Sequence, residues 1–151
     1  MGWLIHANVH VNARGDWSPI ERIDPFFNHR TDNADNVANV VYRLVALADD
    51  QNLTPTSVPR VAGKDTSGTL YIGQSRSLFG RVGQLLNALR GNGGHNAGNY
   101  YHTLGMNVLY PLPLLGITWI ATENQHEAEK SFLQAYAAAF RETPPLNRKA
   151  I

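Results

Sequence analysis

The segment from residue 68 to residue 89 constrains the fold of this chain more than any other part of the sequence. Residues 69–72 are mostly apolar and suit a short strand, which ends at Gly73. Ser75 can start a helix by capping it through its hydroxyl group. Apolar residues then recur at helical spacing, namely Leu78, Phe79, Val82, Leu85, Leu86 and Leu89. The segment therefore predicts a strand followed directly by an amphipathic helix over residues 75–89, and Gly73 would let a ligand approach their junction closely.

The composition allows one ordinary globular domain. A chain of 151 residues with 43% hydrophobic residues can bury a proper core. It contains no cysteine, which excludes disulfides, thiolate catalysis and zinc sites with cysteine ligands. The formal net charge is only +1, so any binding of nucleic acid must rely on a local cluster of basic side chains.

The sequence also carries expectations about location. No run of about 18 apolar residues occurs, so we expect no membrane span. The first six residues lack a basic segment and a long apolar core, which is not the pattern of a secretory signal. We therefore expect a cytoplasmic protein, with delivery as a secreted toxin left open.

Hydrophobic patterns predict the remaining elements. Residues 5–12 alternate between apolar and polar side chains, which predicts a half-buried strand. Residues 32–48 carry an apolar stripe at helical spacing, which predicts a helix. The other expected elements are a loop over 15–25, a hairpin with strands at 57–62 and 69–72 around a turn at 63–68, a glycine-rich loop over 91–98, a short helix over 99–109, a strand over 116–122 and a long helix over 123–141.

These elements predict an α+β fold, with a small three-stranded antiparallel sheet flanked by helices. We expect residues 1–55 to form a strand–helix extension that packs on a core made by residues 56–151. Together the two parts would make a single compact domain.

Tyr71 and Arg81 are the first candidates for chemistry. Arg81 follows Tyr71 by ten residues, with a helix start between them, so the helix can return the guanidinium toward the phenol. A guanidinium can grip phosphate oxygens and stabilise charge in a transition state. A tyrosine has an unperturbed pKa of about 10 and needs cationic or hydrogen-bonding neighbours to act as a base near neutral pH. Taken singly, each residue is as well explained by packing or by a solvated surface.

Tyr71-Ile72-Gly73, followed by Ser75, Leu78 and Arg81, resembles the second half of the GIY-YIG nuclease signature. The order of expected elements over residues 57–147 is also similar to the core of that family. The resemblance implies an endonuclease that hydrolyses DNA phosphodiester bonds with Mg²⁺, for which Mn²⁺ is a possible substitute. It makes Tyr71 the general base and Arg81 the group that holds the phosphate.

The resemblance implies a metal ligand and a supporting amide as well. The family has a glutamate early in the helix after the third strand, and Glu129 fits that position. One carboxylate with waters and a substrate phosphate suits Mg²⁺. Glu123 and Glu127 compete for this role, but Glu123 suits a helix N-terminus, and Glu127 points to a different side of the helix from Glu129. Asn147 matches the asparagine that ends many family members and supports the geometry of the site.

The histidine of the site is left open between two residues. Many relatives carry a histidine one turn beyond the arginine, where this chain has Leu85. His95 and His102 are the substitutes, and we favour His95 as catalytic because the glycine-rich loop can fold it over the site. His6 and His10 lie four residues apart, about 13 Å along a strand, which is too far to chelate one ion.

The expected substrate-binding residues combine the glycine junction with nearby basic side chains. They are Gly73, Ser75, Arg76, Arg90, His102 and Arg148. If the protein is a nuclease, its arginines should gather around Tyr71 and Glu129.

One position departs from the family pattern. The first motif ends in a tyrosine on the first hairpin strand, and in residues 57–61 Pro59 stands in its place. This departure keeps a second interpretation open, a degenerate member that binds nucleic acid or a protein partner without cutting. Because nothing follows residue 147 but four residues, targeting would come from residues 1–55, from loop 91–98, or from a partner or dimer.

Overall fold

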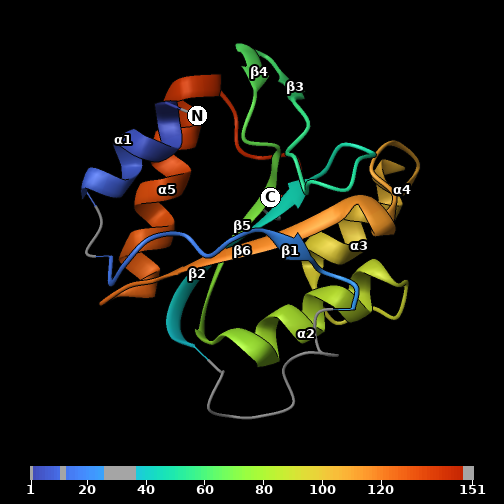
Figure 1. Cartoon of the computed structure of the whole chain (residues 1–151), viewed down its shortest axis with the longest axis horizontal. Helices are drawn as coiled ribbons and strands as arrows, with labels where there is room; N and C mark the ends of the chain where they lie inside the picture. Colours follow the sequence, from blue (N-terminus) through green and yellow to red (C-terminus); the bar gives the residue numbers. More distant parts are fainter. Residues whose placement is uncertain (1, 11–12, 26–36, 148–151) are drawn as a thin grey trace.

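The computed structural model describes residues 2–10, 13–25 and 37–147, and these form an α+β fold (Figure 1). The main sheet is antiparallel, as predicted, and its strand order is β1-β6-β2-β5. The strands are β1 (Glu21–Arg22), β2 (Ala38–Ala46), β5 (Thr69–Ser77) and β6 (Leu115–Ala121). β3 (Val58–Arg60) and β4 (Gly63–Asp65) pair only with each other. Four strands therefore form the main sheet, where the sequence predicted three.

The helix predicted over residues 32–48 is wrong in its described part, because residues 38–46 form the central strand β2. Every residue from Val40 to Ala46 is buried, since both faces of the strand are covered. A strand buried on both faces has no polar alternation. Its apolar residues at 40, 41, 44 and 45 happen to match helical spacing, whereas its valines favour a strand. Residues 32–36 lie outside the described part.

The strand predicted over residues 5–12 is also wrong, since Gly2–His10 forms the helix α1. Trp3, Leu4 and Ala7 are buried, and they share a helix face against α5 (Gln125–Phe140). Ile5, which the alternation placed in the core, is 65% exposed. Residues 11 and 12 of the predicted strand lie outside the described residues.

The predicted hairpin between residues 57–62 and 69–72 does not form. β5 pairs with β2 on one side, and Tyr42 lies opposite Gly73 in that ladder. The region before residue 55 therefore supplies the middle of the sheet. It is not a strand–helix extension on a core that begins at residue 56.

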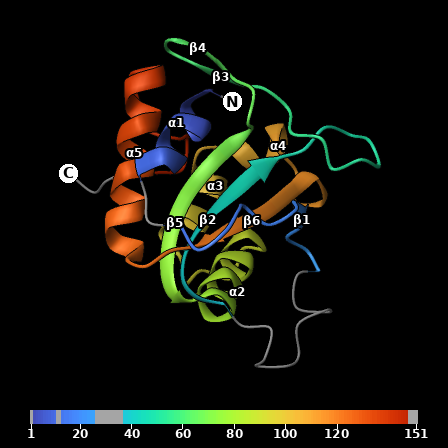
Figure 2. The same ribbon diagram turned by 60° about the vertical axis from the view of Figure 1, so that its left-hand side comes forward.

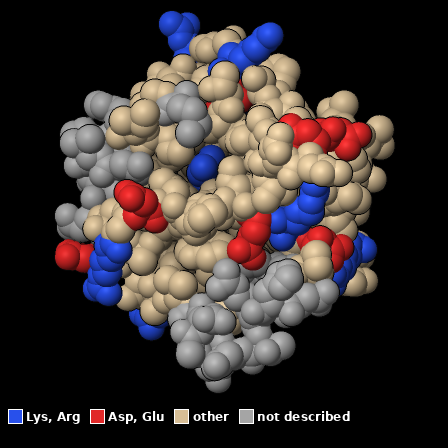
Figure 3. Space-filling view, viewed as in Figure 1, with Lys and Arg blue, Asp and Glu red and all other residues tan. Residues whose placement is uncertain are grey.

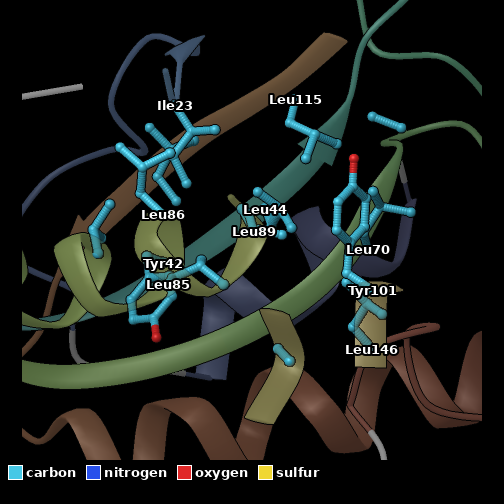
Figure 4. Packing of buried hydrophobic residues seen from close by; sticks show 14 of the residues in the cluster. Ile23, Tyr42, Leu44, Leu70, Leu85, Leu86, Leu89, Tyr101, Leu115 and Leu146 are labelled. Atoms are coloured by element: carbon cyan, nitrogen blue, oxygen red, sulfur yellow. The ribbon is translucent and has the colours of Figure 1, made fainter. Parts of the chain in front are cut away.

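Helices cover both faces of the main sheet (Figure 2). α2 (Leu78–Leu89) packs with α3 (Asn96–Thr103), which is followed by α4 (Met106–Leu109) and a 3-10 turn at Leu112–Leu114. α1 packs with α5 on the other side. Alternate residues of β2 serve the two layers: Tyr42 and Leu44 join the core under α2, and Val41 joins the core under α5 (Figure 4).

Several predicted elements are confirmed with small shifts at their ends. β6 matches the predicted third strand, α5 the long helix, and α2 the amphipathic helix. The strand before α2 runs longer than predicted, to Ser77, so Ser75 does not cap the helix. The Ser75 hydroxyl instead donates to the Ser77 carbonyl at 2.8 Å and accepts from the Ser77 N–H at 3.0 Å.

None of the helices in the described ranges combines the length and the apolar character that a membrane crossing requires.

Candidate functional site

A cavity of about 240 Å³, called here the first cavity, lies beside β5. Its lining includes all the residues that the sequence analysis named as catalytic: Tyr71, Arg81, His95, Glu129 and Asn147. Tyr71 comes from β5, Arg81 from α2 and Glu129 from α5. His95 immediately precedes α3, and Asn147 lies in the segment after α5. Residues that are up to 76 positions apart in the chain thus converge on one hollow.

Tyr42 is a site residue that the sequence analysis missed, because residues 32–48 were expected to be helical. It is fully buried in β2, opposite Gly73, and its ring centroid lies 6.0 Å from that of Tyr71. A Cβ at residue 73 would stand 2.4 Å from Tyr42 Cζ and 2.8 Å from Tyr71 Cε2. A side chain at residue 73 would therefore collide with both tyrosines, so Gly73 is needed for them to meet. The sequence feature that could have pointed to Tyr42 is the tyrosine at the end of the apolar run Val40-Val41-Tyr42.

His95, favoured over His102 from the sequence, is buried at the first cavity. Its Nδ1 accepts a hydrogen bond from the Ala97 N–H at 3.1 Å and so caps α3. The ring proton therefore lies on Nε2, which donates to the Tyr42 hydroxyl at 3.3 Å. Burial, aided by the charge of Arg81, lowers the pKa of His95 to about 4, so the imidazole is neutral near pH 7.

The two tyrosines differ in how readily they ionise. Burial raises the pKa of Tyr42 well above 10, and the neighbouring Tyr71 raises it further. The pKa of Tyr71 is raised mainly by burial and then by the charge of Glu129. The positive charge of Arg81 lowers it, and so do hydrogen bonds to the Tyr42 and Arg81 side chains. Arg81 lowers the pKa of both tyrosines, but the hydrogen bond between them lowers the pKa of Tyr71 and raises that of Tyr42, so Tyr71 is the easier of the two to deprotonate.

Arg81 brings positive charge to the cavity without a carboxylate bound to it. Its Nη1 donates to the Gln84 side chain at 2.6 Å, one turn further along α2. In the described part of the chain no acidic side chain forms an ion pair with it. The guanidinium therefore keeps donors available for an anion.

Glu129 brings a carboxylate that also lacks a bonded partner within the described ranges. Burial raises its pKa, and the charges of His126 and Arg81 oppose that rise. A half-buried, unpaired carboxylate is a suitable ligand for a hard cation such as Mg²⁺, which keeps most of its waters and needs few protein ligands. No group of three or more metal-binding side chains occurs among the residues described.

Asn147 fixes the C-terminal segment to β5. Its Oδ1 accepts from the Ile72 N–H and its Nδ2 donates to the Ile72 carbonyl, both at 2.8 Å. The Leu146 N–H donates to the Leu70 carbonyl at 2.9 Å, which extends the contact. Leu146 and Asn147 thus hold the backbone on either side of Tyr71, and both line the first cavity.

A second cavity, of about 470 Å³, adjoins the first. The two share Tyr71, Arg81 and Glu129. The remaining lining residues of the second cavity are Gln74, Ser75, Arg76, Gln125 and His126. Ser75 and Arg76 were expected to bind substrate, and both lie here.

Other expected residues lie apart from both cavities. Arg90 forms an ion pair with Asp24 at the end of α2. His102 Nε2 donates to the Leu89 carbonyl at 2.8 Å, so it joins α3 to α2. Neither residue lines the two cavities, so the structure does not bring them together with the other expected site residues. Arg148 and the side chains of His6 and His10 lie outside the described part of the structure.

Charge on the face of the molecule seen in Figure 3 is mixed. Figure 3 shows basic and acidic side chains interspersed on one face of the molecule, without an extended area of one sign. Of the arginines that we expected around Tyr71 and Glu129, Arg76 and Arg81 are there. Positive charge at the site is therefore local.

Comparison with known proteins gives no relative: no family model, no curated protein and no solved structure matches this chain.

Proposed function

We propose that this chain is a metal-dependent endonuclease that hydrolyses DNA phosphodiester bonds at a GIY-YIG-type site. The observation that carries the proposal is the convergence of Tyr71, Arg81, His95, Glu129 and Asn147 on the first cavity. They include a phenol, a guanidinium and a carboxylate, which are the groups that water activation, phosphate binding and cation binding require.

Tyr42 strengthens this proposal and replaces Pro59 in it. Residue 59 lies in β3, which does not pair with β5. Tyr42 ends the apolar run Val40-Val41-Tyr42 on the strand that does pair with β5, opposite Gly73. We therefore assign Tyr42, not residue 59, to the place of the first-motif tyrosine.

The roles of the side chains follow from their surroundings. Tyr71 is the more readily ionised tyrosine, and it acts as a base only after it has released its own phenolic proton to solvent; the phenolate oxygen would then take a proton from the attacking water. Tyr42 bonds to that oxygen and is itself held by His95, and Arg81 would offset the charge that grows on the phosphate. A Mg²⁺ ion bound at Glu129 would supply Lewis-acid stabilisation of the phosphate oxygens. Neutralising Glu129 also weakens the repulsion that raises the pKa of Tyr71.

The runner-up is a module that binds nucleic acid or a protein partner without cutting. One observation favours it: the pKa of both tyrosines is raised, so without an added cation both are protonated near neutral pH. A binder of this kind would keep Arg76 and Arg81 for contact and would not depend on Glu129.

Cleavage of supercoiled plasmid in Mg²⁺ tests the proposal. We expect the wild-type chain to nick or linearise the plasmid, and Glu129→Gln and Tyr71→Phe each to lower the rate at least about a hundredfold. Glu127→Gln is the matched control, because it removes an exposed carboxylate of the same helix that does not line either cavity. It should cut like the wild type.

Two results would contradict the nuclease. Equal cutting by all four proteins would point to a contaminant or another site. A wild-type chain that binds DNA but cuts neither plasmid nor branched or single-stranded substrates would favour the non-cutting module.

A further inference from the structure

The two cavities differ in the chemistry of their walls. The first includes Ala97, Leu133 and Leu146 beside its polar groups. Every residue that lines the second has a polar or charged side chain or a phenol. Sites for apolar ligands are lined mainly by hydrophobic side chains. The second cavity thus suits a hydrophilic, charged segment of a ligand better than a nucleobase or an aliphatic group.

Arg76 gives the second cavity a cation that other residues do not neutralise. It is exposed on β5, and within the described ranges it takes part in no ion pair or hydrogen bond. His126, on the first turn of α5, also lines this cavity and can donate through a ring N–H in either neutral tautomer. The described residues that line this cavity thus include these donors and Arg81, and Glu129 is the only carboxylate among them.

The open edge of β5 adds backbone groups. β5 is the last strand of the main sheet, and Ile72 directs its N–H and carbonyl away from β2 toward Asn147. In a strand, backbone groups two residues apart point to the same side. Gln74 and Arg76 therefore present theirs on the same edge as Ile72, beyond the reach of Asn147 and along the second cavity.

We propose that the second cavity binds the sugar-phosphate backbone next to the phosphate held in the first cavity. Arg76 contacts the neighbouring phosphate, with His126 as a second donor. This inference rests on the proposed function and deepens it, because it makes the substrate a strand with at least two consecutive phosphodiesters. The shared residues Tyr71, Arg81 and Glu129 then lie at the point where one phosphate follows the other.

A length comparison tests the proposal. Thymidine dinucleotide has one phosphodiester and the trinucleotide has two, and their dissociation constants are measured by NMR titration of the full chain in EDTA. The proteins are the wild type, Arg76→Gln and Arg141→Gln. Arg141 is an exposed arginine just beyond the far end of α5, so its substitution removes the same charge away from both cavities.

We expect the second phosphodiester to tighten wild-type binding by roughly five- to tenfold, as one charge-assisted contact would. Arg76→Gln should reduce this gain to about twofold or less. Arg141→Gln should keep it. Substitution of an exposed side chain should leave folding intact, which far-UV circular dichroism checks.

The outcomes separate this inference from the nuclease proposal. An equal gain in wild type and Arg76→Gln, or no gain in the wild type, overturns the second-cavity assignment and leaves plasmid cleavage unaffected. A loss of gain in Arg141→Gln that matches Arg76→Gln would mean general charge attraction, which also overturns it. If plasmid cleavage fails while the Arg76-dependent gain persists, the cavity binds a strand that the protein does not cut.

Discussion

Two carboxylates in this protein have opposite surroundings. Asp65, at the end of β4, is fully buried. It accepts hydrogen bonds from Trp3 Nε1 of α1 at 3.3 Å and from the Thr69 N–H at 3.1 Å. Ser67 donates to it twice, through its N–H at 2.9 Å and through its hydroxyl at 2.6 Å. Glu129 faces both cavities and accepts no hydrogen bond from the described residues.

The arginines near these carboxylates differ in burial. Arg43 is buried, donates to Thr69 Oγ1 at 2.7 Å and lies over the Trp17 ring, with its Cζ 4.8 Å from the ring centroid. Burial lowers its pKa to about 10, and the charge of Asp65 opposes that change. Arg81 lines both cavities, donates to Gln84 and has no carboxylate partner among the described residues.

The comparison separates structural polar groups from functional ones. A buried charge that is enclosed by donors stabilises the fold and has nothing left for a ligand. A half-buried charge that faces a hollow costs desolvation energy and keeps its bonding capacity. We therefore expect substitutions at Asp65 to affect stability and substitutions at Glu129 to affect activity.

The largest effect should come from Asp65→Ala. Loss of the carboxylate leaves Arg43 without its countercharge and two backbone N–H groups without an acceptor. The free energy of unfolding should fall by about 3–5 kcal/mol, measured by urea denaturation. Asp65→Asn, which retains an acceptor oxygen, should cost less.

Glu129→Gln is the counterpart in that measurement. Because burial raises the pKa of Glu129, its charged form is unfavourable in the fold at pH 7. The substitution should leave the free energy of unfolding unchanged or raise it by less than about 1 kcal/mol. A loss as large as that of Asp65→Ala would break the comparison and make Glu129 a structural residue.

An intermediate effect should appear in the pH dependence of stability. The pKa of His95 is about 4 in the fold and about 6.5 when unfolded, so below pH 6.5 the unfolded chain takes up the proton first. Stability should therefore be constant with respect to this group above pH 7 and fall between pH 6.5 and 4, by up to ~3 kcal/mol. Other groups also titrate in this range, so the measured quantity is the difference between wild type and His95→Asn.

Asparagine is a suitable comparison because it can still cap α3. The free energies of unfolding of the two proteins, measured from pH 7 to pH 4.5, should converge as the wild type loses stability relative to His95→Asn. A difference in the free energy of unfolding that stays constant with pH would show that His95 is not held neutral by the fold.

The smallest expected effect distinguishes two buried tyrosines. Tyr42→Phe removes the acceptor of His95, and Tyr101→Phe removes a hydroxyl that donates to the Tyr110 carbonyl at 2.6 Å. Each should lower the free energy of unfolding by about 1 kcal/mol. Only Tyr42→Phe should also slow plasmid cleavage, by roughly tenfold, since Tyr42 contacts the site and Tyr101 does not line it. Equal cleavage by the two variants would remove Tyr42 from the site.

Much of the candidate site was accessible from the sequence because its signals are local. The spacing of Tyr71 and Arg81 spans one strand–helix junction, and α2 follows from the apolar stripe after it. The position of Glu129 follows from a helix that the pattern predicted within two residues at its start. His95 was favoured because glycines surround it, and the loop does bring it to the first cavity.

The errors came from segments whose conformation depends on what covers them. In β2 the apolar pattern fits a helix and a doubly buried strand equally, and burial on both faces decided for the strand. In α1 the alternation of side chains suggested a strand, but packing of Trp3, Leu4 and Ala7 against α5 needs a helix face. Missing β2 also meant missing Tyr42.

The sequence by itself determined which reactive side chains lie on which local elements: a tyrosine on a strand, an arginine on the helix after it, and a glutamate early in the last helix. Hydrophobic periodicity and glycine placement act over one or two turns, so they specify such neighbours. Only the tertiary structure decided that β2 lies beside β5, because strand pairing joins segments some thirty residues apart through contacts that no local pattern encodes. That pairing brings Tyr42 to Tyr71 and His95, and it leaves the outer edge of β5 open to the second cavity.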